Sequence, residues 1–109
     1  MPWLVREGEV LASVEEATSF NARGKGLLGR DGVEGVILLK PARSVHTIGM
    51  RFGIDVCFVD DEMKVLRVVT MRPWRLGRVV RKAAAAIEAE AGTFAHWELK
   101  AGDQLEIKG

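Results

Sequence analysis

The chain lacks the features that would direct it into a membrane or toward a disulfide-stabilised fold. Its single cysteine, Cys57, cannot form an internal disulfide. No uncharged apolar run reaches the roughly 18 residues of a membrane span. The first residues carry charges at Arg6, Glu7 and Glu9 and are not typical of a signal peptide. We therefore expect a cytoplasmic protein.

The chain also lacks a large excess of charge of either sign. Sixteen Lys+Arg residues face 15 Asp+Glu residues, which leaves a net charge of +1. A near-neutral protein has no global field for polyanions, so we predict neither nucleic acid nor a membrane as a partner. The local distribution is uneven, because six basic residues and no acid lie between Val65 and Ile87: Arg67, Arg72, Arg75, Arg78, Arg81 and Lys82.

Length and apolar pattern together predict one strand-rich domain over residues 1–109. A chain of 109 residues matches the usual size of a single domain. Short apolar or alternating runs bounded by glycine, proline and acidic turns are typical of strands. Strands are expected at about 3–5, 9–14, 36–39, 54–59, 64–72, 85–90 and 104–108. Helices are expected at about Phe20–Leu28, capped by Thr18 or Ser19, and from Gly92 to about Leu99, capped by Thr93.

These elements predict an α+β fold: a mostly antiparallel sheet, curled into a partly open barrel, with two short helices. Curling of the sheet removes exposed edge strands. A parallel α/β arrangement would need longer crossover helices than the pattern contains.

The stretch from Ser44 to Asp60 concentrates the unusual chemistry. It contains His46, one of two histidines, together with Asp55 and Cys57 inside an otherwise apolar strand. A strand of this kind offers no electropositive setting for a reactive thiol, so Cys57 is expected to be a core residue. The spacing of the histidines, Asp55 and Cys57 does not match a zinc site, so neither a metal nor another cofactor is predicted.

Several segments together resemble the domain of unknown function 192 family. They are Gly26-Leu27-Leu28-Gly29-Arg30, the run from Ser44 to Phe52, the strand from Ile54 to Asp60, Ala91-Gly92 and Ala101-Gly102-Asp103. The resemblance covers about residues 17–107, and its core is His-Thr-x-Gly-Met-x-x-x-Ile-Asp. It implies a compact strand-rich α+β fold of prokaryotic proteins and no particular activity. Two departures are Met63, where the family commonly has glycine in a hairpin, and Gly24 within the first helix.

Two interpretations of His46 and Asp55 remain open. If the loop folds back on the strand, the carboxylate could fix the imidazole tautomer, and the pair could perform acid–base chemistry. Alternatively, Asp55 and Thr47 satisfy buried backbone groups and have a structural role.

The basic segment from Arg72 to Lys82 gives a second candidate site. Its arginines could bind a small anion or phosphate, or they could form a solvated face opposite the acidic turn at Asp60–Glu62. The leading hypothesis is a binding module for a small anionic or polar molecule, lined by His46, Thr47, Met50, Asp55, Arg75 and Arg78. The alternatives are a hydrolase-like enzyme that uses His46 and Asp55, and a structural or protein-interaction domain.

Overall fold

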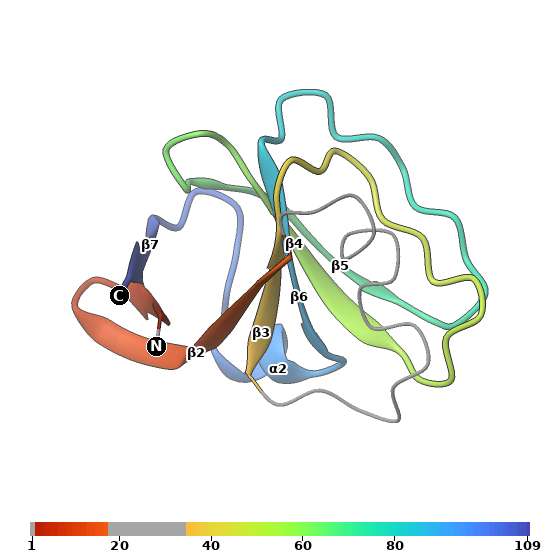
Figure 1. Cartoon of the computed structure of the whole chain (residues 1–109), viewed down its shortest axis with the longest axis horizontal. Helices are drawn as coiled ribbons and strands as arrows, with labels where there is room; N and C mark the ends of the chain where they lie inside the picture. Colours follow the sequence, from red (N-terminus) through yellow and green to blue (C-terminus); the bar gives the residue numbers. More distant parts are fainter. Residues whose placement is uncertain (1, 18–34) are drawn as a thin grey trace.

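The computed structural model describes residues 2–17 and 35–109, and it shows a small strand-rich domain (Figure 1). The elements in this part of the chain are β1 (Trp3–Arg6), β2 (Glu9–Ala17), β3 (Val36–Leu39), β4 (Ile54–Val59), β5 (Val65–Met71), β6 (Ala85–Glu90), helix α2 (Thr93–His96) and β7 (Leu105–Lys108). The strand predictions are confirmed to within a few residues. The helix predicted over Phe20–Leu28 and the segment Gly26–Arg30 lie outside the described residues.

The strands form one mixed sheet in the order β5-β4-β6-β3-β2-β1-β7. Every neighbouring pair is antiparallel except β2 and β3, which run parallel. Parallel neighbours need a long connection, and the chain between Ala17 and Val36 is long enough to provide it. The expectation of a mostly antiparallel sheet is therefore only approximately correct, and the sheet is mixed.

The sheet does not close into a continuous barrel, although its two edges approach each other at one end. Val65 N–H donates to the Asp103 carbonyl at 2.8 Å, and Leu105 N–H donates to the Met63 carbonyl at 3.0 Å. These contacts join the start of β5 to the start of β7. They also fix Met63 at φ 66°, a left-handed conformation that glycine adopts without strain. Met63 therefore adopts a glycine-like turn conformation.

Two apolar clusters cover the opposite faces of the central strands. The first cluster contains Cys57, Val59, Ile87 and Phe94. The second contains Ile37, Ile54, Val56, Phe58, Met50 and Met71. Because successive residues of a strand point to opposite faces, adjacent residues of β4 enter different clusters. β4 is buried along its whole length, as expected for a central strand.

An irregularity between Phe58 and Val59 changes which residues of β5 share a face. Val65 pairs with Val59, whereas Arg67 pairs with Phe58, so one additional residue of β5 lies between the two pairs. A bulge of this kind moves the residues on either side of it to opposite faces. The expected common face of Val65, Arg67, Val69 and Met71 is therefore wrong for Val65, which joins the first cluster.

β6 is a strand despite the alanines around it. Residues Ala85–Ala89 are all buried between β3 and β4, where small side chains fit close to neighbouring strands. Tertiary packing therefore outweighs the helical propensity of alanine, as the period-two pattern indicated. No helix in the described part of the chain is long and apolar enough to cross a membrane.

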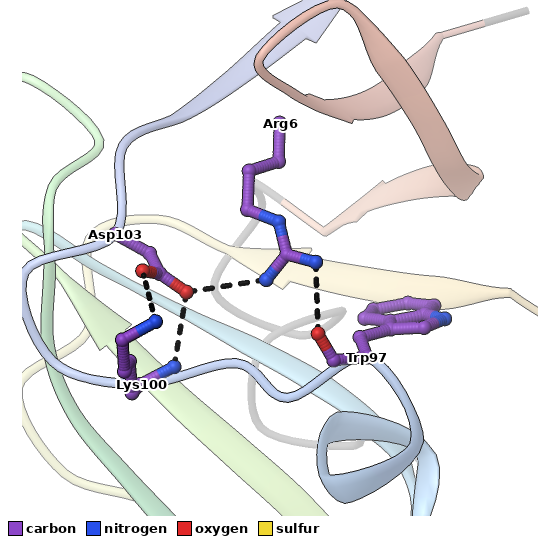
Figure 2. A network of polar contacts seen from close by, with 4 residues as sticks. All are labelled: Arg6, Trp97, Lys100 and Asp103. Atoms are coloured by element: carbon purple, nitrogen blue, oxygen red, sulfur yellow. Dashed lines mark hydrogen bonds and ion pairs between the residues drawn. The ribbon is translucent and has the colours of Figure 1, made fainter.

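A polar network joins the first strand to the last part of the chain (Figure 2). The Arg6 guanidinium contacts the Asp103 carboxylate at 3.2 Å and donates to the Trp97 carbonyl at 2.8 Å. Lys100 contacts the same carboxylate through its backbone N–H at 3.1 Å and its Nζ at 3.4 Å. Asp103 belongs to a segment that carries the family resemblance, and its contacts here are structural.

Candidate functional site

Two loop segments run antiparallel beside each other and form what we call the surface ribbon, residues 43–48 and 74–80. The Thr47 N–H donates to the Arg75 carbonyl at 2.8 Å, Gly77 N–H to Val45 at 3.0 Å, and Val80 N–H to Arg43 at 2.7 Å. An isolated bridge pairs His46 with Leu76. Figure 1 shows the two segments following each other along one side of the molecule. The ribbon joins the family motif to the basic segment.

Gly77 permits the close approach of the two ribbon segments. A Cβ at this position would lie 2.5 Å from the Val45 carbonyl oxygen, which is shorter than real Cβ contacts. Any larger residue would therefore push the two segments apart.

Thr47 holds the ribbon to the end of β5. Its side chain is fully buried, and its hydroxyl donates to the Arg72 carbonyl at 2.6 Å while it accepts from the Arg75 N–H at 2.9 Å. Its own carbonyl accepts from Trp74 N–H at 2.8 Å. These bonds satisfy the backbone of an irregular loop that has no regular strand partner. Thr47 therefore positions residues 72–75 and does not present its hydroxyl to solvent.

Asp55 performs a similar structural task on the other face of the sheet. One carboxylate oxygen accepts from the Thr70 hydroxyl at 2.7 Å, and the other accepts from Gly92 N–H at 3.0 Å and Phe94 N–H at 2.9 Å. The last two groups belong to the start of α2, where backbone N–H groups lack helical partners. Asp55 thus caps α2 from a distant strand. The prediction of Thr93 as the cap is wrong, because Gly92 occupies that position and has no side chain.

The structure does not bring His46 and Asp55 together. His46 is exposed on the ribbon, and its Nδ1 accepts from the Ile48 N–H at 3.3 Å. The Asp55 carboxylate accepts from the N–H of Phe94, which belongs to the first cluster, whereas Met50 is buried in the second with Ile54 and Val56. The sheet therefore separates Asp55 from the loop that carries His46 and Met50. None of the hydrogen bonds between described residues forms the expected acid–base pair.

Arg75 and Arg78 do line a common groove, of about 460 Å³, between the basic loop and the edge strand β5. The groove also contains two further arginines, Arg67 and Arg72, together with Thr70, Leu76 and Gly77. Phe58, Val69 and Met71 form its apolar part. We call it the arginine groove. None of the described residues that line it is acidic.

The electrostatics of the arginine groove favour an anion. Among the described residues, no ion pair engages Arg67, Arg72, Arg75 or Arg78. The Arg75 guanidinium donates to the Pro73 and Trp74 carbonyls at 3.3 and 3.4 Å, which directs its charge along the loop. Guanidinium groups that lie beside an apolar surface and form no ion pair with the described residues can bind a carboxylate or a phosphate.

The acidic turn does not neutralise these arginines directly. Within the described chain, no ion pair joins the arginines of the groove to Asp60–Glu62. The Asp60 carboxylate instead accepts from the backbone N–H groups of Glu62 and Lys64, both at 2.9 Å. The basic loop begins at Arg72, at the opposite end of β5 from this turn.

Sequence reasoning missed Arg67, Arg72 and the apolar part of the groove as binding residues. Two features of the sequence could have identified them: the acid-free run from Val65 to Ile87, and the common strand face of Arg67, Val69 and Met71. The sequence pattern did not show that the loop after Pro73 folds back along β5. That path depends on Thr47, which lies in a different part of the chain.

The other reactive groups in the described part of the chain do not form a second centre. Cys57 is fully buried, as expected, and burial together with the charge of Asp103 raises its thiol pKa to about 12. A larger groove of about 770 Å³ has a mainly acidic polar lining, formed by Asp60–Glu62, Glu16 and Glu106 together with Lys40. The described residues contain no group of three or more histidine, cysteine or acidic side chains able to hold a metal ion.

The structure thus defines a small mixed-sheet domain with an arginine-lined groove at one sheet edge. Comparison with known proteins identifies its family. The family model described as Uncharacterized ACR, domain of unknown function 192, matches residues 4–107. The chain belongs to this family, which confirms the resemblance noted in the sequence.

Relatives and solved structures agree with this assignment. The chain is 32% identical over 98 residues to a UPF0127 protein of Pyrococcus abyssi, which covers 85% of this chain and 84% of the relative. It is 30% identical over 103 residues to a UPF0127 protein of Pyrococcus furiosus, with 90% and 89% covered.

Two solved structures share the fold. A protein of unknown function from Novosphingobium aromaticivorans has a TM-score of 0.82 at 18% identity, over 96% of this chain and 82% of that one. A Sinorhizobium meliloti protein, provisionally described as a transcription regulator, has a TM-score of 0.83 at 20% identity, with 96% and 90% covered. At these identities the likeness concerns the fold alone, and the family has no established activity.

Proposed function

We propose that this protein is a binding module for a small anionic molecule with an apolar body, held in the arginine groove. The observation that carries the proposal is the lining itself, in which the described residues supply four arginines and no acid around Phe58, Val69 and Met71. Small-molecule sites are commonly built from an apolar wall and a few convergent polar groups.

The chemistry of the groove narrows the ligand class. A planar guanidinium offers paired donors that match the oxygens of a carboxylate, phosphate or sulfate group. The apolar part offers no hydrogen bonds to a sugar or a second charged group and favours a ring or alkyl body. The expected ligand is therefore an amphiphilic anion such as an aryl or alkyl phosphate.

No observation favours the acid–base alternative. Both carboxylate oxygens of Asp55 already accept hydrogen bonds from Thr70, Gly92 and Phe94, and His46 lies on the outer side of the ribbon. General acid–base catalysis needs the two groups within hydrogen-bond reach of a shared substrate. The cytoplasmic location expected from the sequence stays a prediction.

The test compares three probes by calorimetry and thermal shift: phenyl phosphate, inorganic phosphate and neutral phenol. We expect phenyl phosphate to bind more tightly than either fragment, because it uses both the charge and the apolar part of the groove. A ligand that binds only the native state raises its melting temperature. The Arg75→Gln/Arg78→Gln variant should lose at least about tenfold in affinity, since each charge-assisted bond contributes about 1.5 to 3 kcal/mol.

Arg81→Gln is the matched control, because Arg81 belongs to the same basic segment but does not line the groove. It should bind phenyl phosphate within about twofold of the wild type, as expected for an exposed charge outside the site. An equal loss in the control and in the groove variant would show non-specific attraction and contradict the proposal. So would the absence of binding by phenyl phosphate to the wild type.

A further inference from the structure

Exposed apolar side chains gather on the surface ribbon. The described residues contain six large hydrophobic side chains that are clearly exposed, and four of them lie on the ribbon: Ile48 at 41%, Trp74 at 64%, Leu76 at 79% and Val79 at 65%. The other two, Trp3 and Val10, lie on the β1–β2 hairpin. Scattered exposed apolar residues need no explanation, but a group on two paired segments marks an interaction surface.

The backbone of the ribbon holds these side chains outward. Thr47 and Val45 are buried, whereas their neighbours His46 and Ile48 are exposed, which is the alternation of an extended segment with one face on the core. The His46–Leu76 bridge sets the register between the two segments. The Trp74 N–H donates to the Thr47 carbonyl and holds the Trp74 backbone next to the Thr47–Ile48 peptide.

Trp74 adopts a strained conformation in this exposed position. Its φ of 65° lies in the left-handed region, which costs a residue other than glycine about 1 kcal/mol or more. The strain is maintained by the bonds from Thr47 and by the Arg75 guanidinium, which donates to the Trp74 carbonyl. Because the indole is 64% exposed, packing inside this chain does not account for the strain.

The charge around these side chains indicates the nature of the partner. Arg72, Arg75, Arg78 and Arg81 accompany Trp74, Leu76 and Val79 in one segment that contains no acid. A partner that complements the ribbon therefore has a negatively charged surface with an apolar layer beneath it. We propose that the surface ribbon docks on an anionic phospholipid bilayer, with Ile48, Trp74 and Leu76 at the headgroup boundary and the arginines on lipid phosphates.

A bilayer fits these observations better than an acidic protein. Protein partners bury anchors in shaped pockets. Ile48, Trp74 and Val79 instead project from the ribbon and line neither the arginine groove nor the larger groove, and Leu76, which does line the arginine groove, is 79% exposed. Tryptophan is enriched at membrane–water interfaces, and basic residues near an anionic leaflet each strengthen attraction about fivefold. The net charge of +1 predicted no such partner because it averages over the acidic surfaces elsewhere.

The experiment measures co-sedimentation of the whole chain with vesicles of equimolar phosphatidylserine and phosphatidylcholine, and with vesicles of phosphatidylcholine alone. We expect binding to the anionic vesicles, weakened by salt, and at least about tenfold less binding to the neutral ones. Ile48→Ser/Trp74→Ser should reduce partition to anionic vesicles by at least about tenfold. Neither residue lines the arginine groove, so the affinity for phenyl phosphate should remain unchanged.

Val10→Ser is the matched control, because Val10 is 57% exposed but lies away from the ribbon. It should leave partition unchanged. The docking proposal would be overturned if the folded Ile48→Ser/Trp74→Ser variant partitioned to anionic vesicles as strongly as the wild type. It would also be overturned if the wild type failed to bind anionic vesicles, and an acidic protein would then be the expected partner of the ribbon. If the protein bound vesicles but not phenyl phosphate, the docking proposal would stand and the proposed ligand of the arginine groove would be wrong.

Discussion

The carboxylate of Asp55 accepts a hydrogen bond from the backbone N–H of Phe94 at 2.9 Å, across 39 residues of sequence. This bond attaches the start of α2 to the beginning of β4. It explains why an aspartate lies within a fully buried apolar strand: a charged acceptor satisfies helix N–H groups that have no other partner. The family motif around Asp55 is therefore architectural at this position.

Asp55→Ala should destabilise the fold by about 3 kcal/mol, because it leaves the buried Phe94 N–H and the part-buried Gly92 N–H without an acceptor. Asp55→Asn should cost less, about 1 to 2 kcal/mol, since its amide oxygen can accept both bonds and its NH₂ can donate to Thr70. Urea denaturation of the three proteins measures the order. Equal stability of all three would contradict the capping role.

Thr47→Val should destabilise the chain by about 2 to 3 kcal/mol and weaken the binding of phenyl phosphate. The variant keeps the shape of the side chain but leaves the Arg75 N–H and the Arg72 carbonyl without their hydroxyl partner. Thr47→Ser is the control, because it retains the hydroxyl and loses one methyl group, at about 1 kcal/mol. Denaturation and calorimetry on both variants test the prediction, and a serine variant as impaired as the valine one would argue against it.

Glu88 should make stability depend on pH. Its side chain is 4% exposed on the face of β6 that also carries Ala86, between Ile37 and Val56, and its Oε1 has no hydrogen-bond partner. Burial raises its pKa from 4.5 to about 7. The protonated form therefore favours folding, so this contribution is fully present below about pH 4.5 and is lost as pH rises through about 7.

Glu88→Gln should remove this dependence, because the amide stays neutral. At pH 8 the variant should be more stable than the wild type by about 3 kcal/mol at most, the free energy that corresponds to the pKa difference. At pH 4 the two proteins should be similar. Denaturation at both pH values measures the difference, with Glu90→Gln as an exposed control on the same strand. A constant difference across pH would rule out titration of Glu88 as the cause.

The Arg6–Asp103 contact should show measurable coupling in a double-mutant cycle. Both side chains are largely buried, at 23% and 13% exposed, and Arg6 also binds the Trp97 carbonyl. We expect Arg6→Met and Asp103→Asn to couple by about 1 to 3 kcal/mol. The exposed pair Lys108–Glu106, at 3.9 Å, provides the comparison and should couple by less than about 1 kcal/mol.

The same contact should weaken in acid. Burial alone would raise the pKa of Asp103, but the backbone N–H and charge of Lys100 and the bond from Arg6 outweigh it and lower that pKa. A lowered pKa contributes stability above the ordinary value for aspartate, and this stability is lost as pH falls through the folded value. The coupling should therefore disappear in acid, and its persistence there would indicate a packing effect of the Arg6 side chain.

Local pattern was sufficient for the strands because it reflects a local cause. Side chains of a strand alternate between faces every two residues, and turns need particular residue types, so both leave a signal in neighbouring positions. The run Ile54–Val59 and the alternating Ala85–Glu90 were located correctly for this reason. The bulge beside Phe58 left no such signal, and the face assigned to Val65 was wrong.

The candidate site was only partly predictable, because its members meet through loops. Arg75 and Arg78 were identified from the acid-free charge run, and they line the groove. Asp55 shares strand parity with Cys57, which was available in the sequence and places it on the face away from Met50. The shared parity of Asp55 and Cys57 did not predict that Asp55 binds the start of α2. The sequence does not show which distant backbone N–H groups need an acceptor.

By itself, the sequence determined the strand-rich domain, the family, the core position of Cys57 and the concentration of positive charge after β5. Each of these depends on composition or on periodicity along the chain. The tertiary structure decided that Thr47 and Asp55 are structural, that His46 has no carboxylate partner among the described residues, and that four arginines share one groove. These outcomes depend on the paths of the loops. Long-range hydrogen bonds determine those paths, and the local sequence does not specify which groups form them.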